Sequence, residues 1–371
     1  MSSEEPPACQ SVFFGSPRRP GNLLRDLLEA RLQAVSAGGE VAWATYYFRD
    51  ERLARALVAA HQRGVKVTVA VEGRPRQRTA NQRVVRLLRA RGSLEQGCRP
   101  VVHWLPSGLG CRVPRLHEKI YYFSSPYPHA LIGSFNPSGS EVPDPEIIKK
   151  IGDQDRGHNF LAEIVHPRLV QALRERVIDS HELGVPKLWG GRLRSATSIN
   201  IGHSQLYFFP SAGLPPLENA LAHLSPGTSI RIATSHFNDR GFLRLLTRLA
   251  ANDVSVSIIA HDTARRVPKS VEAALGQHPM ISFLRYQHPL GFPMHNKFIL
   301  VDEGGSRRAF FGSLNLSQRS LRGNREVLLV TRQADVYARF EECWREMFQE
   351  CRQFSPDFQG RSGNNPERNS E

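Results

Sequence analysis

The pattern of apolar and polar positions predicts that helices and strands alternate along the first half of the chain. Leucines recur at helical spacing after Asn22, whereas shorter apolar segments have the alternating or continuous pattern of strands. Asp50 can cap one helix and Gly64 can end it. The residues up to about Pro20 are expected to be irregular. We predict helices over residues 22–35, 51–63, 84–91 and 167–183, and strands over residues 40–48, 65–71 and 101–105.

The same order of elements returns in the second half of the chain. A strand over residues 229–234, a helix over 239–251 and a strand over 254–260 repeat the earlier pattern at one offset (239 − 50 = 189). A constant offset indicates a duplicated unit rather than a chance likeness in composition. The matched positions are Ala44 and Ala233, Thr45 and Thr234, Phe48 and Phe237, Asp50 and Asp239, and Val65 and Val254.

Each unit alternates strands with helices, which predicts an α/β lobe whose helices cover a largely buried sheet. We expect the first lobe to cover residues 20–184 and the second to cover residues 195–353. The segment 184–194 between them is rich in Gly and Pro and reads as a linker, and a last helix is predicted over residues 334–351. Residues 354–371 are rich in Ser, Asn, Gly and Pro, so a disordered tail is expected there.

A His-x-Lys sequence occurs at matching places in both units, His117 with Lys119 and His295 with Lys297. Each continues into β-favouring residues, so its His and Lys should project from the same face of a strand. A Gly-Ser-x-Asn sequence follows each one at almost equal distance. One such motif is a weak signal, whereas two of each within a duplicated fold are hard to obtain by chance. The serines and asparagines of these sequences are Ser134, Asn136, Ser313 and Asn315.

With these paired motifs the sequence resembles the phospholipase D superfamily, whose signature is HxKxxxxD followed by GSxN. The resemblance covers about residues 20–350. The second copy is complete through Asp302, whereas the first copy has Ser124 where the signature has Asp. The resemblance implies two similar phospholipase D-like lobes, each a mixed β-sheet flanked by helices. It further implies that a pseudo-two-fold axis relates the lobes and that the active site lies between them.

The residue types of the motifs suit the cleavage of a phosphodiester, an anion whose leaving oxygen needs a proton. A neutral imidazole can attack phosphorus, and a second, protonated imidazole can donate to the leaving oxygen. The two lysines and the two Ser/Asn pairs can hold the non-bridging oxygens, so neither a metal nor another cofactor is expected. The resemblance implies a phosphohistidine intermediate and then transfer to water or an alcohol. Analogy with two-copy members favours His117 as nucleophile and His295 as acid, although the order of the motifs does not settle this.

The resemblance also assigns roles to carboxylates outside the His-x-Lys pairs. Asp302 would support the surroundings of its motif, while a carboxylate further along the chain would orient each imidazole. Glu326 fits that second role for the second copy. For the first copy Glu163 is the candidate, with Asn159 as its rival.

Composition indicates the sign of the partner's charge but does not identify the partner. Lys and Arg number 49 against 35 Asp and Glu, for a formal net charge of +14, which favours an anionic partner. Five cysteines without a CxxC spacing argue against a disulfide framework or a zinc site. Seven arginines either form an anion-binding face or lie on a solvated helix and loop: Arg74, Arg76, Arg78, Arg83, Arg86, Arg89 and Arg91.

The expected location is the cytoplasm, with peripheral contact with an anionic membrane left open. The sequence has no apolar run of about 18 residues. Its N-terminal residues also lack the basic-then-apolar order of a secretion signal. Because both motifs lie in one chain, we expect the protein to function as a monomer.

Three functions remain open at this point. A phospholipase D or cardiolipin synthase-like phosphatidyltransferase is favoured, because two motif copies in one chain resemble soluble bacterial members of that group. A nuclease fits the charge and the kind of bond, but simple nucleases of the superfamily usually carry one motif per chain. An inactive binding protein is the third possibility, because of Ser124. Five aromatic residues either line the substrate pocket or pack in the core, and core packing is favoured: Tyr46, Tyr47, Phe48, His236 and Phe237.

Overall fold

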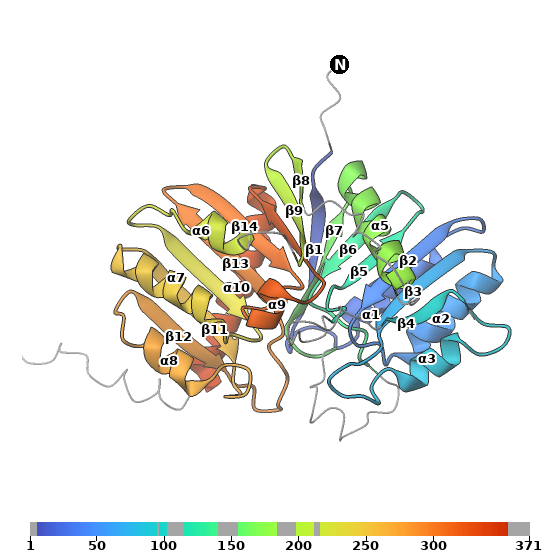
Figure 1. The fold of residues 1–371 in the computed structure, drawn as a ribbon, viewed down its shortest axis with the longest axis horizontal. Coiled ribbons are helices and arrows are strands. Elements are labelled where there is room, and N and C mark those ends of the chain that lie inside the picture. The colour runs from blue at the N-terminus through green and yellow to red at the C-terminus, as the bar shows by residue number, and fades with distance from the viewer. Residues whose placement is uncertain are drawn as a thin grey trace, which may run out of the picture.

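The computed structural model describes residues 6–94, 96–101, 115–139, 155–183, 198–210 and 216–354. These residues form two α/β lobes, each built around one mixed sheet (Figure 1). The first sheet has the order β1-β7-β6-β5-β2-β3-β4, from β1 (Cys9–Gly15), β2 (Glu40–Thr45), β3 (Lys66–Glu72), β4 (Cys98–Val101), β5 (Ile120–Phe123), β6 (His129–Gly133) and β7 (Asn159–Ile164). The second has the order β12-β11-β10-β13-β14-β15-β9-β8, from β8 (Ser198–Ile201), β9 (Ser204–Phe209), β10 (Ser229–Thr234), β11 (Ser255–His261), β12 (Ile281–Tyr286), β13 (Lys297–Glu303), β14 (Ser306–Gly312) and β15 (Glu326–Thr331).

The two sheets repeat one topology. When the first is listed from its opposite edge, β4-β3-β2-β5-β6-β7-β1 corresponds strand by strand to β12-β11-β10-β13-β14-β15-β9. The pairs β2–β3 and β3–β4 are parallel, as are β10–β11 and β11–β12, while the remaining corresponding pairs are antiparallel. The prediction of two similar lobes with mixed sheets and flanking helices is confirmed.

Helices cover the outer face of each sheet, and two long helices lie on the inner faces (Figure 1). Apolar residues of α1–α3 pack on the first sheet and those of α6–α8 on the second. A third core contains residues of both sheets together with α5 and α10, so it joins the lobes. The helices are α1 (Leu23–Gln33), α2 (Glu51–Gln62), α3 (Gln82–Leu88), α5 (Pro167–Leu183), α6 (Pro216–Leu221), α7 (Arg240–Ala251), α8 (Lys269–Leu275), α9 (Gln318–Arg322) and α10 (Ala334–Phe354).

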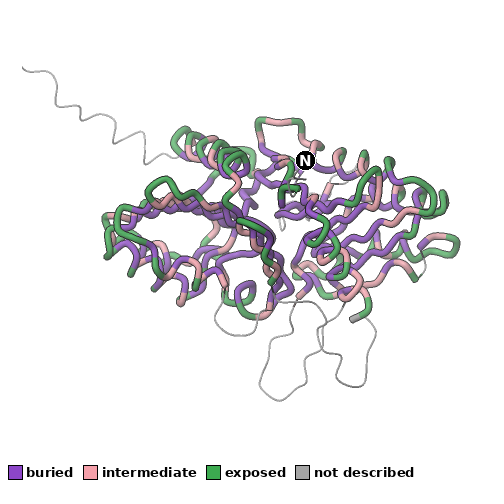
Figure 2. Tube along the Cα trace, turned by 90° about the horizontal axis from the view of Figure 1, so that it is seen from above, coloured by how far each residue is buried: buried purple, intermediate pink, exposed green. Residues whose placement is uncertain are grey.

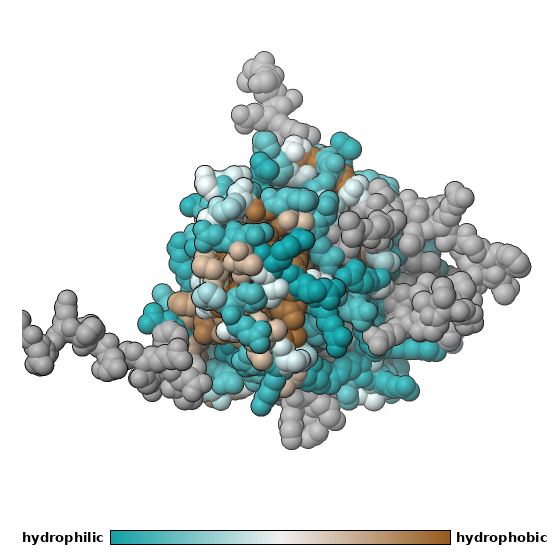
Figure 3. Space-filling model, turned by 60° about the vertical axis from the view of Figure 1, so that its left-hand side comes forward, coloured by the Kyte–Doolittle hydropathy of each residue, from teal (hydrophilic) through white to brown (hydrophobic). Residues whose placement is uncertain are grey.

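Strand β2 shows how the sequence builds these layers. Val41 and Trp43 face the outer core, whereas Ala42 and Ala44 face the core between the lobes, because side chains alternate across a sheet. Figure 2 shows the result, with buried positions along the strands and exposed positions at the periphery. Hydrophilic residues cover most of the face that Figure 3 brings forward, and apolar residues show there in smaller patches.

The two ends of helices α2 and α7 repeat at the offset seen in the sequence. Asp50 accepts a hydrogen bond from the backbone N–H of Leu53 at 2.9 Å, and Asp239 accepts the equivalent bond from Phe242 at 2.8 Å. After each helix the chain turns through a left-handed residue, Gly64 at φ 89° and Asp253 at φ 60°. The predicted cap and stop of this helix are therefore present in both copies.

Strand β1 corrects the expected start of the first lobe. The residues before Pro20 are not irregular throughout, because Cys9–Gly15 pairs antiparallel with β7 at the sheet edge. The first lobe therefore begins before residue 20. The predicted strand 101–105 lies largely outside the described residues, as do the linker 184–194 and the tail 355–371. Among the described helices none is long and apolar enough to cross a membrane.

Candidate active site

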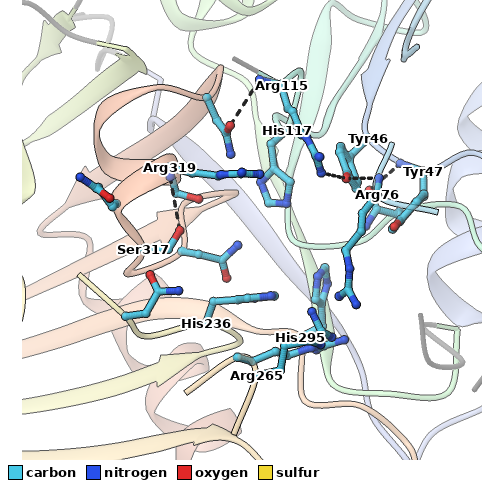
Figure 4. Close-up of a pocket in the computed structure, with 17 residues that line it drawn as sticks. Tyr46, Tyr47, Arg76, Arg115, His117, His236, Arg265, His295, Ser317 and Arg319 are labelled. Carbon is cyan, nitrogen blue, oxygen red and sulfur yellow. Dashed lines mark hydrogen bonds between the residues drawn. The ribbon is translucent and has the colours of Figure 1, made fainter. Parts of the chain in front are cut away.

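The two His-x-Lys sequences meet at the junction of the lobes. Both imidazoles line one pocket, His117 from the segment before β5 and His295 from the segment before β13 (Figure 4). The duplicated motifs therefore converge on a single site.

Backbone hydrogen bonds between the lobes hold this convergence. The N–H of His117 donates to the carbonyl oxygen of Arg325 at 3.0 Å, and the N–H of Arg325 donates to that of Arg115 at 2.8 Å. On the other side of the pseudo-two-fold axis, the N–H of His295 donates to the carbonyl oxygen of His158 at 2.9 Å. Two parallel bridges thus tie the start of each motif to the opposite lobe.

Each imidazole is oriented by a residue of the other lobe. The Nδ1 atom of His117 lies 2.8 Å from the carboxylate of Glu326, at the start of β15. The Nδ1 atom of His295 donates to the side-chain oxygen of Asn159, at the start of β7, at 2.9 Å. The expectation that Glu326 serves the imidazole of its own copy is therefore wrong. In both histidines the opposite ring nitrogen, Nε2, has no hydrogen-bond partner among the residues that the structure describes.

Glu163 does not orient an imidazole of the pocket. It lies further along β7, where its carboxylate pairs with Arg31 at 2.9 Å and accepts a hydrogen bond from the hydroxyl of Tyr127 at 3.2 Å. The sequence prediction for Glu163 is wrong, and its rival Asn159 occupies the orienting position. The reason is register, since the residue that faces the other lobe is the first of the strand.

The serines of the two GSxN sequences support the orienting residues. Ser313 donates to the carboxylate of Glu326 at 2.5 Å, and Ser134 donates to the side-chain oxygen of Asn159 at 3.2 Å. Both serines are fully buried, and neither is among the residues that line the pocket. The expectation that Ser134 and Ser313 hold phosphate oxygens is therefore not met. Their asparagine partners, Asn136 and Asn315, do line the pocket.

The glycines that open the GSxN sequences permit close packing of strands. A Cβ atom at Gly312 would overlap the carbonyl oxygen of Val327, and one at Gly133 would overlap that of Phe160. Both carbonyl groups lie one residue after an orienting side chain. A larger residue would therefore push β15 or β7 away and displace Glu326 or Asn159.

We expect Gly312→Ala to lower both stability and turnover. The clash should reduce the free energy of unfolding by about 1–3 kcal/mol. Displacement of Glu326 should lower kcat by about a hundredfold. Gly276→Ala is the matched control, because the nearest atom to its Cβ would lie 3.5 Å away and its backbone is helical. Urea unfolding and initial rates measure the two effects, and equal behaviour of the two variants would contradict this role of Gly312.

The two lysines lie behind the imidazoles as nearly enclosed cations. Lys297 donates to the carbonyl oxygen of His295 at 2.6 Å, and Lys119 donates to that of His117. Burial lowers the pKa of Lys119 to about 7, against the opposing fields of the carboxylates Glu326 and Glu118. A substrate phosphate placed between the two lysines would favour their charged forms.

The signature Asp and its replacement lie at a distance from the pocket. Asp302 follows Lys297 by five residues along β13, which corresponds to roughly 16 Å at the rise of a strand. Its carboxylate holds the next turn, through Arg307 at 3.0 Å and the N–H of Gly305 at 3.0 Å. Ser124 occupies the corresponding end of β5 and accepts a hydrogen bond from the N–H of Glu40 at 2.7 Å. Ser124 thus replaces Asp in a structural position.

The pocket has a volume of about 530 Å³ and a polar lining. Among the described residues that line it there are five arginines but no carboxylate and no aliphatic side chain. The aromatic residues singled out in the sequence divide between two roles. Tyr46, Tyr47 and His236 line the pocket, whereas Phe48 and Phe237 are buried in the outer cores. The arginines are Arg76, Arg115, Arg265, Arg266 and Arg319.

Burial keeps both imidazoles neutral in the free protein. It lowers the pKa of His117 to about 4, with Lys119 and Lys297 adding to the effect and Glu326 opposing it. Burial also lowers the pKa of His295 well below its ordinary value, and Lys297 and Lys119 act in the same direction. A neutral ring whose Nδ1 carries the proton presents its Nε2 lone pair to the pocket, as a nucleophile requires.

A buried ion cluster between the lobes was not evident from the sequence. Glu118, between His117 and Lys119, accepts hydrogen bonds from Arg176 of α5 at 2.9 Å and from Ser180 at 2.7 Å. Arg325 of the second lobe donates to the same carboxylate at 3.3 Å. Burial would raise the pKa of Glu118, but the two arginines overcome it and lower the pKa to about 2. Glu118 and Arg325 adjoin His117 and Glu326 in the sequence. Their buried ion pairs could not be predicted, because the partners are distant in the chain.

We expect Glu118→Gln to lower the free energy of unfolding by about 3–5 kcal/mol at pH 7, because it leaves two buried guanidiniums without their counter-ion. A carboxyl group whose pKa is lower in the folded protein stabilises the fold above its unfolded pKa of about 4.5 and loses that effect as pH falls toward 2. The difference between wild type and variant should therefore shrink between pH 5 and pH 2. Urea unfolding across this range tests it, with the exposed Glu342→Gln as control. A pH-independent difference would contradict the prediction.

A comparison with protein families agrees with the motifs. The model of the family "Cardiolipin synthase, PLD-like domain" matches residues 32–175 and 221–348, which is more than half of the chain. The chain therefore belongs to this family of the phospholipase D superfamily. No curated protein matches the sequence significantly.

Solved structures show the same fold at low sequence identity. The phosphatidylserine synthase of Haemophilus influenzae Rd KW20 is 13% identical with a TM-score of 0.61, over 92% of this chain and 88% of that one. The polyphosphate kinase of Porphyromonas gingivalis is 16% identical with a TM-score of 0.60, over 91% of this chain. This chain spans 47% of the length of that kinase. At these identities the likeness concerns the fold alone.

Proposed function

We propose that the protein is a metal-independent phosphodiesterase that hydrolyses or transfers phosphatidyl groups of phospholipids through a phosphohistidine. The observation that carries the proposal is the pair of imidazoles in one pocket, each held at Nδ1 by a residue of the other lobe. A neutral imidazole whose Nε2 faces a cationic pocket can attack phosphorus, and the second imidazole can protonate the leaving oxygen once the substrate phosphate beside it has favoured its charged form.

In the first step the Nε2 atom of His117 attacks phosphorus. The new N–P bond forms as the P–O bond to the leaving oxygen breaks, and His295 gives its proton to that oxygen. His295 must be protonated at this point, and the negative phosphate beside it raises its pKa in the complex. The side chains of Asn136 and Asn315, which line the pocket, stabilise the charge on the non-bridging oxygens, and Lys119 and Lys297 add their positive charge from behind the imidazoles.

In the second step His295 acts as the base. It takes the proton of a water molecule or an alcohol, whose oxygen attacks phosphorus and breaks the N–P bond to His117. Water gives a phosphomonoester and an alcohol gives a new diester. The ring of His117 is then neutral again, and His295 loses its proton to solvent when the anionic product leaves, which restores the free protein.

The partners of the two imidazoles support this assignment of roles. A phosphorylated imidazole is cationic, so the ring that carries phosphorus benefits from a carboxylate at Nδ1. His117 has that carboxylate in Glu326, whereas His295 has the neutral amide of Asn159. His117 is therefore the nucleophile and His295 the acid and base.

The family model and the polar pocket support a phospholipid substrate whose phosphodiester and head group lie in the pocket. The matching family is named for cardiolipin synthase, and phosphatidylserine synthase shares the fold. The pocket has no aliphatic lining among the described residues, so it suits the polar head of a lipid while the acyl chains stay outside. The same cationic lining favours a nuclease as the second candidate.

The test compares lipid and DNA substrates in EDTA. Purified protein is incubated with phosphatidylcholine or phosphatidylglycerol plus an alcohol, and separately with plasmid and single-stranded DNA. We expect head-group release or exchange that disappears in His117→Ala and His295→Ala and persists in His61→Ala, whose histidine is exposed on α2. DNA cleavage with this pattern of variants supports the nuclease instead. Binding without turnover of any substrate would sink the enzymatic proposal.

A further inference from the structure

Three arginines gather on the side of the pocket where His295 lies. Arg76 belongs to the first lobe, and Arg265 and Arg266 belong to the second. Arg76 and Arg265 occupy equivalent places in the duplicated units (265 − 76 = 189). Figure 4 shows Arg76 extending from its lobe toward the side of the pocket that contains His295 and Arg265. The pseudo-two-fold axis thus brings cations from both lobes to the same place.

Arg266 is buried and incompletely bonded. It is only 8% exposed, its Nη1 donates to the hydroxyl of Ser235 at 3.1 Å, and its buried Nε has no hydrogen-bond partner. Burial lowers its pKa to about 10, with Arg76 acting in the same direction and Asp262 opposing. A buried guanidinium N–H without an acceptor lowers the stability of the fold, and an anion in the pocket would accept a hydrogen bond from it.

The charge of this cluster exceeds what one phosphodiester needs. In the described part of the chain no carboxylate lies within 4.0 Å of Arg76, Arg265 or Arg266. Asp262 is the acidic residue whose field reaches Arg266, and it already pairs with His261. In the proposed mechanism, Lys119 and Lys297 behind the imidazoles balance the single negative charge of the scissile diester. The arginines therefore provide for a second anionic group.

We propose that Arg76, Arg265 and Arg266 form a subsite that binds a second phosphate group, carried by the leaving part of the substrate. The assignment to the leaving part follows from position, because the cluster lies beside His295, the proposed acid. This assignment to the leaving part rests on the proposed function, in which His295 is the acid. Two phosphates held by guanidinium forks would fix the leaving oxygen against the Nε2 of His295.

A turnover experiment compares substrates that differ by one phosphate. The lipid pair is phosphatidylglycerol and phosphatidylglycerol phosphate, and the nucleotide pair is dTpdT without and with a terminal phosphate. We expect a lower KM for the doubly phosphorylated member of one pair, which names the source. Arg76→Ala and Arg265→Ala should raise its KM by about tenfold to a hundredfold, at least tenfold more than for the singly phosphorylated member. Arg78→Ala, which changes an exposed arginine outside the pocket, is the matched control.

A binding experiment tests the subsite separately from catalysis. By calorimetry, inorganic pyrophosphate should bind the wild-type protein at least tenfold more tightly than inorganic phosphate, and Arg76→Ala and Arg265→Ala should remove this difference. Pyrophosphate that binds no better than phosphate, or that loses affinity equally in Arg78→Ala, overturns the subsite even if diesters are cleaved. Selective pyrophosphate binding without any turnover supports the subsite and refutes the proposed function.

Discussion

Glu326→Gln is expected to lower kcat by about 10³–10⁴-fold with little change in KM. The carboxylate fixes the tautomer of His117 and faces the cation that forms when its ring takes phosphorus. An amide keeps the size of the side chain but removes that charge, and the corresponding Asp→Asn change in a Ser-His-Asp triad lowers kcat by about 10⁴-fold. The loss should appear in kcat, because Glu326 acts on the transition state and does not touch the bound substrate.

The pH profile distinguishes this role from a structural one. In the wild type, kcat/KM should fall as pH drops through about 4, where His117 becomes protonated. Glu326 raises the pKa of His117, so its removal should move this acid limb to lower pH. Glu163→Gln is the matched control, because Glu163 is also buried, on β7, the strand of the first lobe that corresponds to β15, but pairs with Arg31. An equal loss of kcat in both variants would contradict the assignment.

The duplicated part of the fold could be predicted because its signals are local. The helical leucines of α1, the Asp caps of α2 and α7, and the left-handed turns that follow them depend on residues close together in the chain. A single offset then placed the second copy without any knowledge of the structure. The same locality placed each histidine beside its lysine.

The elements that were missed depend on distant partners. Strand β1 is seven residues long, and its partner β7 begins 144 residues after β1 ends (159 − 15 = 144). Its buried side chains, among them Val12 and Phe14, are too few to separate a strand from an apolar loop. These residues pair because the edge of β7 has backbone groups to which β1 can bond, and that edge exists only in the folded lobe.

The exchange of orienting residues between lobes has the same cause. Order in the chain suggested that Glu326 serves the motif of its own copy, yet the parallel bridges set it against His117. Which lobe a side chain faces is a property of the interface. The sequence of the motifs could therefore give the chemical groups, but it could not give the pairs in which they act.

His295→Asn is expected to separate the two chemical steps. With bis(p-nitrophenyl) phosphate the leaving nitrophenolate needs no proton, so His117 can still form the N–P bond when the acid is absent. The second step needs a base for water, so it should slow by about 10²–10⁴-fold. The variant should release one equivalent of nitrophenolate per protein in a burst and then nearly stop.

Mass spectrometry of the protein after the burst shows which histidine carries the phosphoryl group. The His295→Asn variant should carry one nitrophenyl phosphoryl group on the peptide that contains His117, stable to base and labile to acid. His117→Asn should show neither burst nor adduct, with kcat reduced by at least about 10⁴-fold. His61→Asn should turn over like the wild type. A burst retained in His117→Asn, or an adduct on the peptide of His295 in that variant, would reverse the roles of the two imidazoles, because the ring partnered by the amide of Asn159 would then be the one that attacks phosphorus.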